Sequence, residues 1–400
     1  MNEEELETMR KSFNTVKKRS SKINKSKIDK LEKRVKAIKE EAIENQDNLK
    51  QIAIQSFERN GVDVFEAKDS LEAQQIILDL IESYDGFVVA KSKSNTLGEI
   101  NLKSFLADNN IEVVETDLGD RILQLKKTDN KPVHPTGPAS HLNVSEIAKI
   151  VNQSDIEANV HNVAREIMEA VRSDVLDRLK DCNVGISGAN VIAAEEGAVL
   201  LVHNEGNISI VASKDLHIIV AGIDKFVEDL EDAISIAKLE TIYATGNYLT
   251  SYINIISGPS KTADIEKKLL KNMYGAEKVV LILLDNGRSE VDNEALLCIG
   301  CGNCLIHCPV YNAVGNEFGF NNYLGGRGVA MSKFIEDDET CFNSGLYMCT
   351  LCGLCTLNCP VSIPTNEIIE MLRKDSANEG FYPKVHGKIR KNIENHDSPY

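Results

Sequence analysis

The sequence predicts an α/β domain followed by a smaller, mostly helical domain. Between residues 46 and 290, helical periodicity alternates with short apolar runs separated by Gly and Asn turns. This alternation is typical of an α/β fold with a largely parallel sheet. From residue 291 to 375 the apolar runs give way to cysteine-rich segments with helical patterning. Residues 1–45 form a charged N-terminal segment, and residues 376–400 form a polar tail that we expect to be partly ordered.

The N-terminal segment carries one apolar stripe at helical spacing. The stripe consists of Ile28, Leu31, Val35, Ile38 and Ala42. Spacings of three and four residues indicate an amphipathic helix. We expect this helix to pack on its own protein or on a partner, and the basic run at residues 17–19 to be solvated.

The α/β region alternates helices with strands in chain order. We expect helices at residues 51–59, 70–83, 97–108, 160–181 and 225–240. We expect strands at residues 62–66, 87–90, 111–115, 184–194, 198–203, 208–211, 217–221 and 279–284. In the C-terminal domain, helical segments at 294–297 and 366–374 flank the cysteines, with Thr365 as the N-cap of the second.

Eight of the ten cysteines repeat one pattern. The first run is Cys298-x2-Cys301-x2-Cys304-x3-Cys308-Pro309, and the second is Cys349-x2-Cys352-x2-Cys355-x3-Cys359-Pro360. This is the ligand spacing of a [4Fe–4S] ferredoxin segment, whereas zinc sites use paired doublets. The sequence therefore predicts two [4Fe–4S] clusters and a role in electron transfer.

In two-cluster ferredoxins, the fourth cysteine of each run binds the other run's cluster. We therefore expect cluster 1 on Cys298, Cys301, Cys304 and Cys359, and cluster 2 on Cys349, Cys352, Cys355 and Cys308. The two remaining thiols, Cys182 and Cys341, are expected to be buried side chains and not ligands. Glycines between the runs favour tight turns over phosphate binding, because no strand is expected before Gly325.

Composition argues against several functional classes. The net charge of −16 argues against nucleic acid as the main partner. No apolar run approaches the length that spans a bilayer, and the N-terminus lacks the apolar core of a secretion signal. Ten cysteines without such a signal favour a reducing cytoplasm, where thiolates can bind iron.

Polar residues follow two apolar runs in the α/β region, where such sheets place ligand sites. Residues 91–96 follow a buried strand and open a helix, which favours a small anion such as a carboxylate or phosphate. The candidate ligand residues are Lys91, Lys93, Ser94 and Thr96, with Asn204, Glu205, Gly206 and Asn207 in a second polar turn. For this second turn, a tight hairpin and a ligand contact are equal alternatives. We expect His141, His203, His217 and His307 to be structural, hydrogen-bonded side chains.

A series of motifs runs through the α/β region in one order. It comprises Ala90–Ser94, Glu115–Gly119, Pro138–His141, Gly185–Asn190, Ala194–Gly197, Asn204–Asn207, His217–Gly222, Thr250–Ile253, Ser257–Pro259 and Leu284–Ser289, followed by the paired cysteine runs. Over about residues 45–375, this series resembles the LutB-type lactate utilisation proteins, which join a LUD domain to a helical ferredoxin domain. The resemblance implies a NagB/RpiA/CoA-transferase-like fold for residues 46–290.

The resemblance also implies a function. It points to an electron-transfer subunit of a lactate (2-hydroxy acid) oxidation complex, relaying electrons singly beside a cysteine-rich subunit and a second LUD-type subunit. Such a chain is not expected to be catalytic alone. In the alternative, the LUD domain is a ligand-binding or CoA-type catalytic module, and the clusters couple it to a heterodisulfide-reductase-like partner. Glu195 is then the catalytic candidate, by analogy of fold alone.

Two departures from the family pattern bear on these implications. Larger members carry a further C-terminal domain, and members usually have Thr at the position of Glu196. The departures leave the partner subunits and the substrate open.

Overall fold

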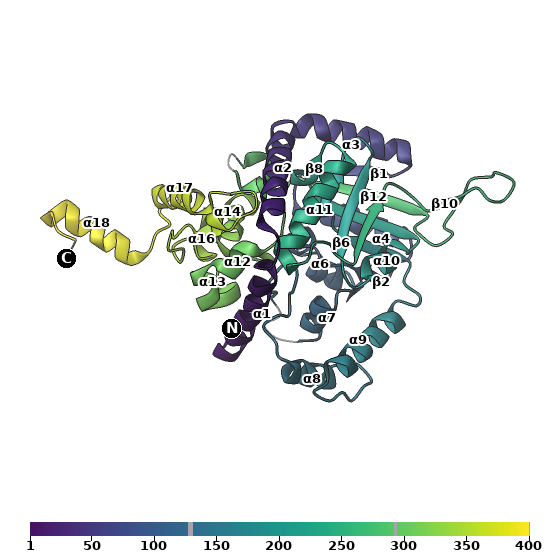
Figure 1. Cartoon of the computed structure of the whole chain (residues 1–400), viewed down its shortest axis with the longest axis horizontal. Helices are drawn as coiled ribbons and strands as arrows, with labels where there is room; N and C mark the ends of the chain where they lie inside the picture. The colour runs from purple at the N-terminus through teal and green to yellow at the C-terminus, as the bar shows by residue number, and fades with distance from the viewer. Residues whose placement is uncertain (127–130, 292–293, 400) are drawn as a thin grey trace.

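The computed structural model describes residues 1–126, 131–291 and 294–399 (Figure 1). Its centre is a six-stranded parallel sheet in the order β1-β12-β7-β4-β2-β3. These strands are β1 (Asp63–Ala67), β12 (Lys278–Leu284), β7 (Leu216–Gly222), β4 (Val184–Ser187), β2 (Val88–Lys91) and β3 (Glu112–Glu115). The parallel sheet and the helical C-terminal region confirm the predicted α/β class with a helical domain behind it.

Both faces of this sheet are covered, which explains why its strands read as continuous apolar runs. Helices α4 (Ser70–Glu82) and α6 (Leu102–Asp108) pack on one face. Helices α8 (Val144–Gln153), α9 (Ala164–Arg178) and α10 (Asn207–Ala212) pack at the edge of the other face. Neighbouring residues on one strand, Val89 and Ala90, belong to opposite cores.

The α/β region also contains a second, smaller sheet of four strands. It has the order β8-β5-β6-β9, from β8 (Phe226–Val227), β5 (Val191–Ala193), β6 (Ala198–His203) and β9 (Tyr252–Ile256). Two short antiparallel ribbons pair β10 (Lys261–Thr262) with β11 (Leu270–Lys271), and β13 (Gly319–Phe320) with β14 (Tyr323–Leu324). Helix α11 (Leu230–Thr245) lies against this sheet, begun by the Asp229 side chain, which accepts a hydrogen bond from the Asp232 amide.

The cysteine region is built from short helices. They are α12 (Asn303–His307), α13 (Pro309–Val314), α14 (Gly325–Ile335), α15 (Asp338–Asn343), α16 (Leu354–Leu357) and α17 (Thr365–Asn378). The final helix, α18 (Lys384–His396), buries none of its residues and extends away from the body in Figure 1. Among the described residues, no helix combines the length and apolarity needed to cross a membrane.

The N-terminal segment folds as two helices that belong to the core. Helices α1 (Glu3–Ser20) and α2 (Lys25–Glu44) run along α11 and the cysteine region (Figure 1). Val35, Ile38 and Ala42 of the predicted stripe are buried, so the stripe packs on its own protein. Helix α1 was not predicted as a separate element, yet it buries Leu6, Met9 and Phe13.

Several predicted elements are wrong in type or extent. Residues 208–211, predicted as a strand, lie in α10, because Gly206 turns the chain at a φ of 85° and begins a helix. The hairpin alternative for residues 204–207 is therefore wrong: the turn joins a strand to a helix. Residues 184–194 are two strands in different sheets, and residues 97–108 are divided between α5 (Asn95–Glu99) and α6 by Asn101 at a φ of 47°.

Other errors are in element boundaries. The helix expected at 225–240 begins only at Leu230, because residues 226–227 form β8. The helix expected at 160–181 spans only Ala164–Arg178, and α7 (Leu118–Leu125) and α8 were not predicted. Thr365 is the first residue of α17 and Pro364 is its N-cap. A two-residue strand, β14, does precede Gly325, but it pairs antiparallel with β13 and so lacks the parallel unit that a dinucleotide site requires.

Candidate iron–sulfur site and adjoining cavity

The structure brings the fourth cysteine of each run beside the other run. Burial raises the pKa of Cys301, and the neighbouring thiolates of Cys298, Cys304 and Cys359 raise it further. Burial likewise raises the pKa of Cys308, whose charged neighbours are Cys355 and Cys349. The cross-ligation itself stays a prediction. Burial disfavours the charged thiolate, and neighbouring thiolates disfavour it further.

The cysteine runs share local conformation as well as spacing. The backbone amides of Gly300 and Leu351 donate to the sulfurs of Cys298 and Cys349, each at 3.4 Å. Gly302 and Gly353, one residue after the second cysteine, have φ values of 71° and 72°. Amide donors to sulfur stabilise thiolates and tune a cluster's potential. The two loops are thus equivalent cradles for the same kind of group.

A small hollow lies between the two cysteine runs. It is lined by five thiols: Cys308, Cys349, Cys352 and Cys355, which are predicted to hold the second cluster, and Cys304, which is predicted to hold the first. Helices α12 and α16 pack together, and the Asn303 side chain donates to the Asn358 carbonyl at 2.7 Å, which joins the two runs. Cys352 is exposed, so this hollow lies near the protein surface.

The other two thiols stand apart from these sets. Cys341 is buried and donates to the Val329 carbonyl, with its pKa raised to about 11 by burial. Cys182 is buried in the loop between α9 and β4 and donates to the Val184 carbonyl. Neither thiol lines the hollow or the larger cavity described next.

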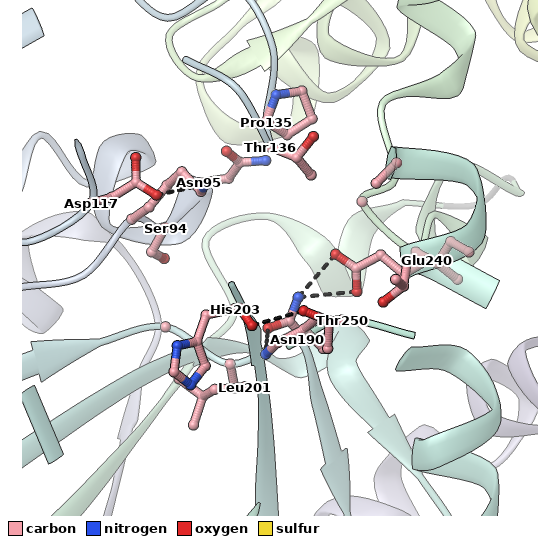
Figure 2. Close-up of a pocket in the computed structure, with 18 of the residues that line it drawn as sticks. Ser94, Asn95, Asp117, Pro135, Thr136, Asn190, Leu201, His203, Glu240 and Thr250 are labelled. Atoms are coloured by element: carbon pink, nitrogen blue, oxygen red, sulfur yellow. Dashed lines mark hydrogen bonds and ion pairs between the residues drawn. The ribbon is translucent and has the colours of Figure 1, made fainter. Parts of the chain in front are cut away.

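A cavity of about 220 Å³ lies between the α/β domain and the first cysteine run. Its floor is formed by residues that follow β2, β3 and β4, including Ser94, Asp117 and Asn190 (Figure 2). The chain leaves β2 for β3 on one side and returns to β4 on the other, so this is the topological switch point where such sheets bind ligands. Residues 298–300 of the first cysteine run also line the cavity.

The structure brings most of the predicted ligand residues to this cavity. Lys93, Ser94, Thr96, Asn204, Glu205 and Asn207 line it. Lys91 does not, because its ammonium is buried against the Glu115 carboxylate at 2.9 Å. Gly206 serves the turn and lies outside the lining.

Glu195 has no support as a catalytic residue. It is exposed in the turn between β5 and β6 and does not line the cavity. Its backbone amide donates to the Glu228 carbonyl, which fixes the turn rather than a substrate.

Two cavity residues that the sequence analysis missed form a buried pair. Asn190 donates to both carboxylate oxygens of Glu240, at 2.9 and 3.0 Å (Figure 2). Burial raises the Glu240 pKa to about 7. A carboxyl group on the otherwise apolar and small-residue face of α11 was the available sequence signal.

A buried ion network ties the α/β domain to the cysteine region beside this cavity. The Arg288 guanidinium holds Glu99 by two hydrogen bonds, at 2.8 and 2.7 Å, and Asp224 by a third at 2.7 Å. Tyr323 donates its hydroxyl to Glu99 at 2.6 Å. Because Tyr323 belongs to the linker between the cysteine runs, this network fixes the linker against the sheet.

The histidines have structural surroundings. His217 is fully buried, shares a hydrogen bond with the Ser187 hydroxyl at 2.8 Å and has its pKa lowered to about 4 by burial. His203 accepts a hydrogen bond from the Gly206 amide and stacks on Tyr252, although it also lines the cavity. His141 is buried and His307 is half-buried.

Comparison with known proteins matches both regions of the chain. A family model described as LUD domain matches residues 50–284, and one described as 4Fe-4S dicluster domain matches residues 294–363. The dicluster match confirms the prediction of two [4Fe–4S] clusters.

Curated relatives extend over most of the chain. Lactate utilization protein B of Lysinibacillus sphaericus is 33% identical over 352 residues, covering 86% of this chain and 72% of that protein. The protein of the same name from Bacillus subtilis is 32% identical over 338 residues, covering 83% and 68%. A solved structure of a DUF162 family protein from Deinococcus radiodurans covers 60% of this chain and 98% of its own, at 11% identity and a TM-score of 0.32.

Proposed function

Because this chain belongs to the lactate utilisation protein B family, we propose that it is the iron–sulfur electron-transfer subunit of a lactate-oxidising complex. The family match supports a LUD domain joined to a two-cluster domain. The observation that carries the proposal is the interleaving of the two cysteine runs, with Cys298 facing the cavity and Cys352 exposed. This arrangement gives an electron path an inner end and an outer end.

We assign cluster 1 to Cys298, Cys301, Cys304 and Cys359, and cluster 2 to Cys349, Cys352, Cys355 and Cys308. The neighbouring thiols, and the presence of all four thiols of the second set in one hollow, support this assignment. When bound, such clusters accept and donate electrons one at a time. The chain's own residues bury Cys301 of the first set and leave Cys352 of the second set exposed, where a partner protein can approach.

We take residues 46–290 as the LUD domain and residues 291–375 as the cluster domain. Residues 1–45 pack on both, and 376–400 form the tail. The six-stranded parallel sheet supports a NagB/RpiA/CoA-transferase-like topology for the first domain. The number of thiols available for iron supports a cytoplasmic location.

Lactate oxidation removes two electrons, so a second centre must separate them before single-electron relay begins. We place that centre on partner subunits, a cysteine-rich protein and a second LUD-type protein, and infer that the chain is not catalytic alone. The cavity favours the second candidate function, in which the LUD domain binds a small ligand, because predicted ligand residues and Cys298 share its lining.

The test begins with protein purified without oxygen. Iron and acid-labile sulfide should each approach about eight per chain, from two cubanes. Lactate-dependent reduction of a dye should be absent with the chain alone and appear when the native partners are added. About four irons, or zinc in their place, contradicts the two-cluster assignment. Lactate oxidation by the isolated chain contradicts the relay function.

A further inference from the structure

The cavity is shared between the α/β domain and the first cysteine run. Its lining includes Cys298 and Gly300 of the cysteine run and Lys93 and Ser94 of the α/β domain. A Cβ atom added at Gly188 would lie 2.4 Å from the Ser94 hydroxyl oxygen, so the loops after β2 and β4 are in direct contact. Anything bound in this cavity therefore lies beside one of the thiols assigned to cluster 1.

The lining carries three cationic and three acidic side chains. Lys93 pairs with Asp117 and Lys225 pairs with Asp224, each at 3.0 Å, whereas Arg327 has no carboxylate partner among the described residues. The two other acidic groups hold protons more tightly than usual, because burial raises the pKa of Glu205 and raises that of Glu240 to about 7. Hydroxyl and amide groups, such as Thr96 and Asn95, make up much of the remaining polar lining. These features favour an anionic ligand.

Arg327 is the cation best placed to contact both a ligand and the cysteine runs. It lines both the cavity and the hollow between the cysteine runs. Its Nε donates to the Ala295 carbonyl at 3.3 Å, and its guanidinium lies 5.2 Å from the centre of the Tyr323 ring. Within the part of the chain that the structure describes, its terminal nitrogens have no hydrogen-bond acceptor. Those nitrogens remain available to an anion.

The volume limits the size of the ligand. An engineered cavity of about 150 Å³ holds benzene, so 220 Å³ has room for a molecule of somewhat more than six heavy atoms. Pockets for drug-sized ligands begin at about 300 Å³. The cavity therefore has room for a three- or four-carbon acid.

We propose that this cavity binds a small carboxylate of 2-hydroxy- or 2-oxo-acid type, and that the bound carboxylate and an electron on cluster 1 disfavour each other. The proposal rests on the proposed function, since it takes Cys298 to be a ligand of cluster 1. Two negative charges in one enclosed site repel, and Arg327 faces both. By linkage, the factor by which reduction of cluster 1 weakens carboxylate binding equals the factor by which bound carboxylate shifts the redox equilibrium of cluster 1 toward the oxidised form.

The experiment uses the full chain with both clusters, purified without oxygen. Calorimetry measures binding of lactate, pyruvate and inorganic phosphate to the oxidised and the dithionite-reduced protein. EPR-monitored redox titration gives the midpoint potential of each cluster with and without each anion. We expect the carboxylates to bind the reduced protein on the order of tenfold more weakly. Each tenfold loss corresponds to a fall of about 59 mV in the potential of cluster 1, with cluster 2 unchanged.

Matched variants separate the ligand from the cluster. Arg327→Gln should abolish carboxylate binding and the shift in potential. Because Arg327 also faces the thiols, Lys93→Gln tests the cavity from the α/β domain, and it should weaken binding while both EPR signals persist. Lys333→Gln is the control: Lys333 lies on the same helix as Arg327 but pairs with Asp338 at 3.3 Å, outside the cavity. It should bind like the wild type.

Each other outcome overturns the proposal. No binding, equal affinity in both redox states, or full binding by both Arg327→Gln and Lys93→Gln removes the carboxylate site or its coupling. Binding of phosphate alone overturns the carboxylate class. A shift in cluster 2 in place of cluster 1 contradicts the location. These failures leave a two-cluster protein with about eight irons, whereas a protein with fewer irons fails the proposed function itself.

Discussion

Replacing Arg288 by Met should strongly destabilise the protein. In the wild type, Arg288 and Glu99 side chains are 2% and 0% exposed and meet in a two-pronged ion pair, with Asp224 as a third partner. Methionine fills much of the same space but leaves Glu99 buried with only neutral donors, Tyr323 and Asn286. The loss of stability comes from the buried Glu99 carboxylate, which no longer has a cationic partner, and not from a cavity.

The expected magnitude follows from the burial of the pair. Removing one partner of a buried ion pair costs about 3–5 kcal/mol. For domains of about 150–250 residues, each kcal/mol lowers the unfolding temperature by about 2–4 °C. The unfolding temperature of Arg288→Met, measured by circular dichroism under anaerobic conditions, should therefore be roughly 6–20 °C below that of the wild type. Arg288→Lys keeps the charge but loses the two-pronged geometry, so its unfolding temperature should lie between those of the wild type and Arg288→Met.

The control removes an ion pair of similar length at the surface. Arg390 meets Glu394 at 2.7 Å, with side chains 72% and 56% exposed. Arg390→Met should leave the unfolding temperature unchanged, because solvent screens such pairs. An Arg288→Met protein that melts with the wild type would refute the view that this network fixes the linker to the sheet.

Further predictions concern the cavity, the N-terminus and the spare thiols. Burial raises the Glu240 pKa from 4.5 to about 7, so protonated Glu240 is favoured in the folded state. Its contribution to the free energy of unfolding is fully present below pH 4.5 and is lost as the pH rises through 7. Urea titrations should show Glu240→Gln gaining roughly 3 kcal/mol on the wild type across that range; a difference independent of pH contradicts the burial argument. Deleting residues 1–20 should lower both stability and iron content, because Phe13 stacks on Tyr311 and Arg10 bonds the Asn312 carbonyl; retention of both properties contradicts this. Alanine at Cys182 and Cys341 should keep about eight irons, and loss of four would make one of them a ligand.

The sequence predicts the fold class well because its signals are local and repeated. The apolar run at 279–284 and the stripe on α2 each reflect burial along one element. The prediction failed where short apolar runs fit two structures, as at residues 208–211, since Ile208 and Val211 are buried at helical spacing as well. Helix α1 was missed because its buried side chains are sparse among charged residues.

The candidate site divides in the same way. Cysteine spacing predicts the iron–sulfur site because the ligands are close in sequence. The cavity depends on Asn190, Glu240 and Arg327, which come from three separate segments and meet only through tertiary packing. Lys91 was predicted to contact a ligand because polar residues follow the strand at this point. In the structure it instead forms an ion pair with Glu115 on the neighbouring strand, which the sequence did not reveal.

The most direct test of the account is EPR of the reduced Cys308→Ser and Cys359→Ser proteins, with iron analysis of each. Cross-ligation predicts that Cys308→Ser alters the signal of the cluster held by Cys349, Cys352 and Cys355, and that Cys359→Ser alters the other signal. The result that contradicts it is the reverse pairing, in which each substitution alters the signal of the cluster held by its own run.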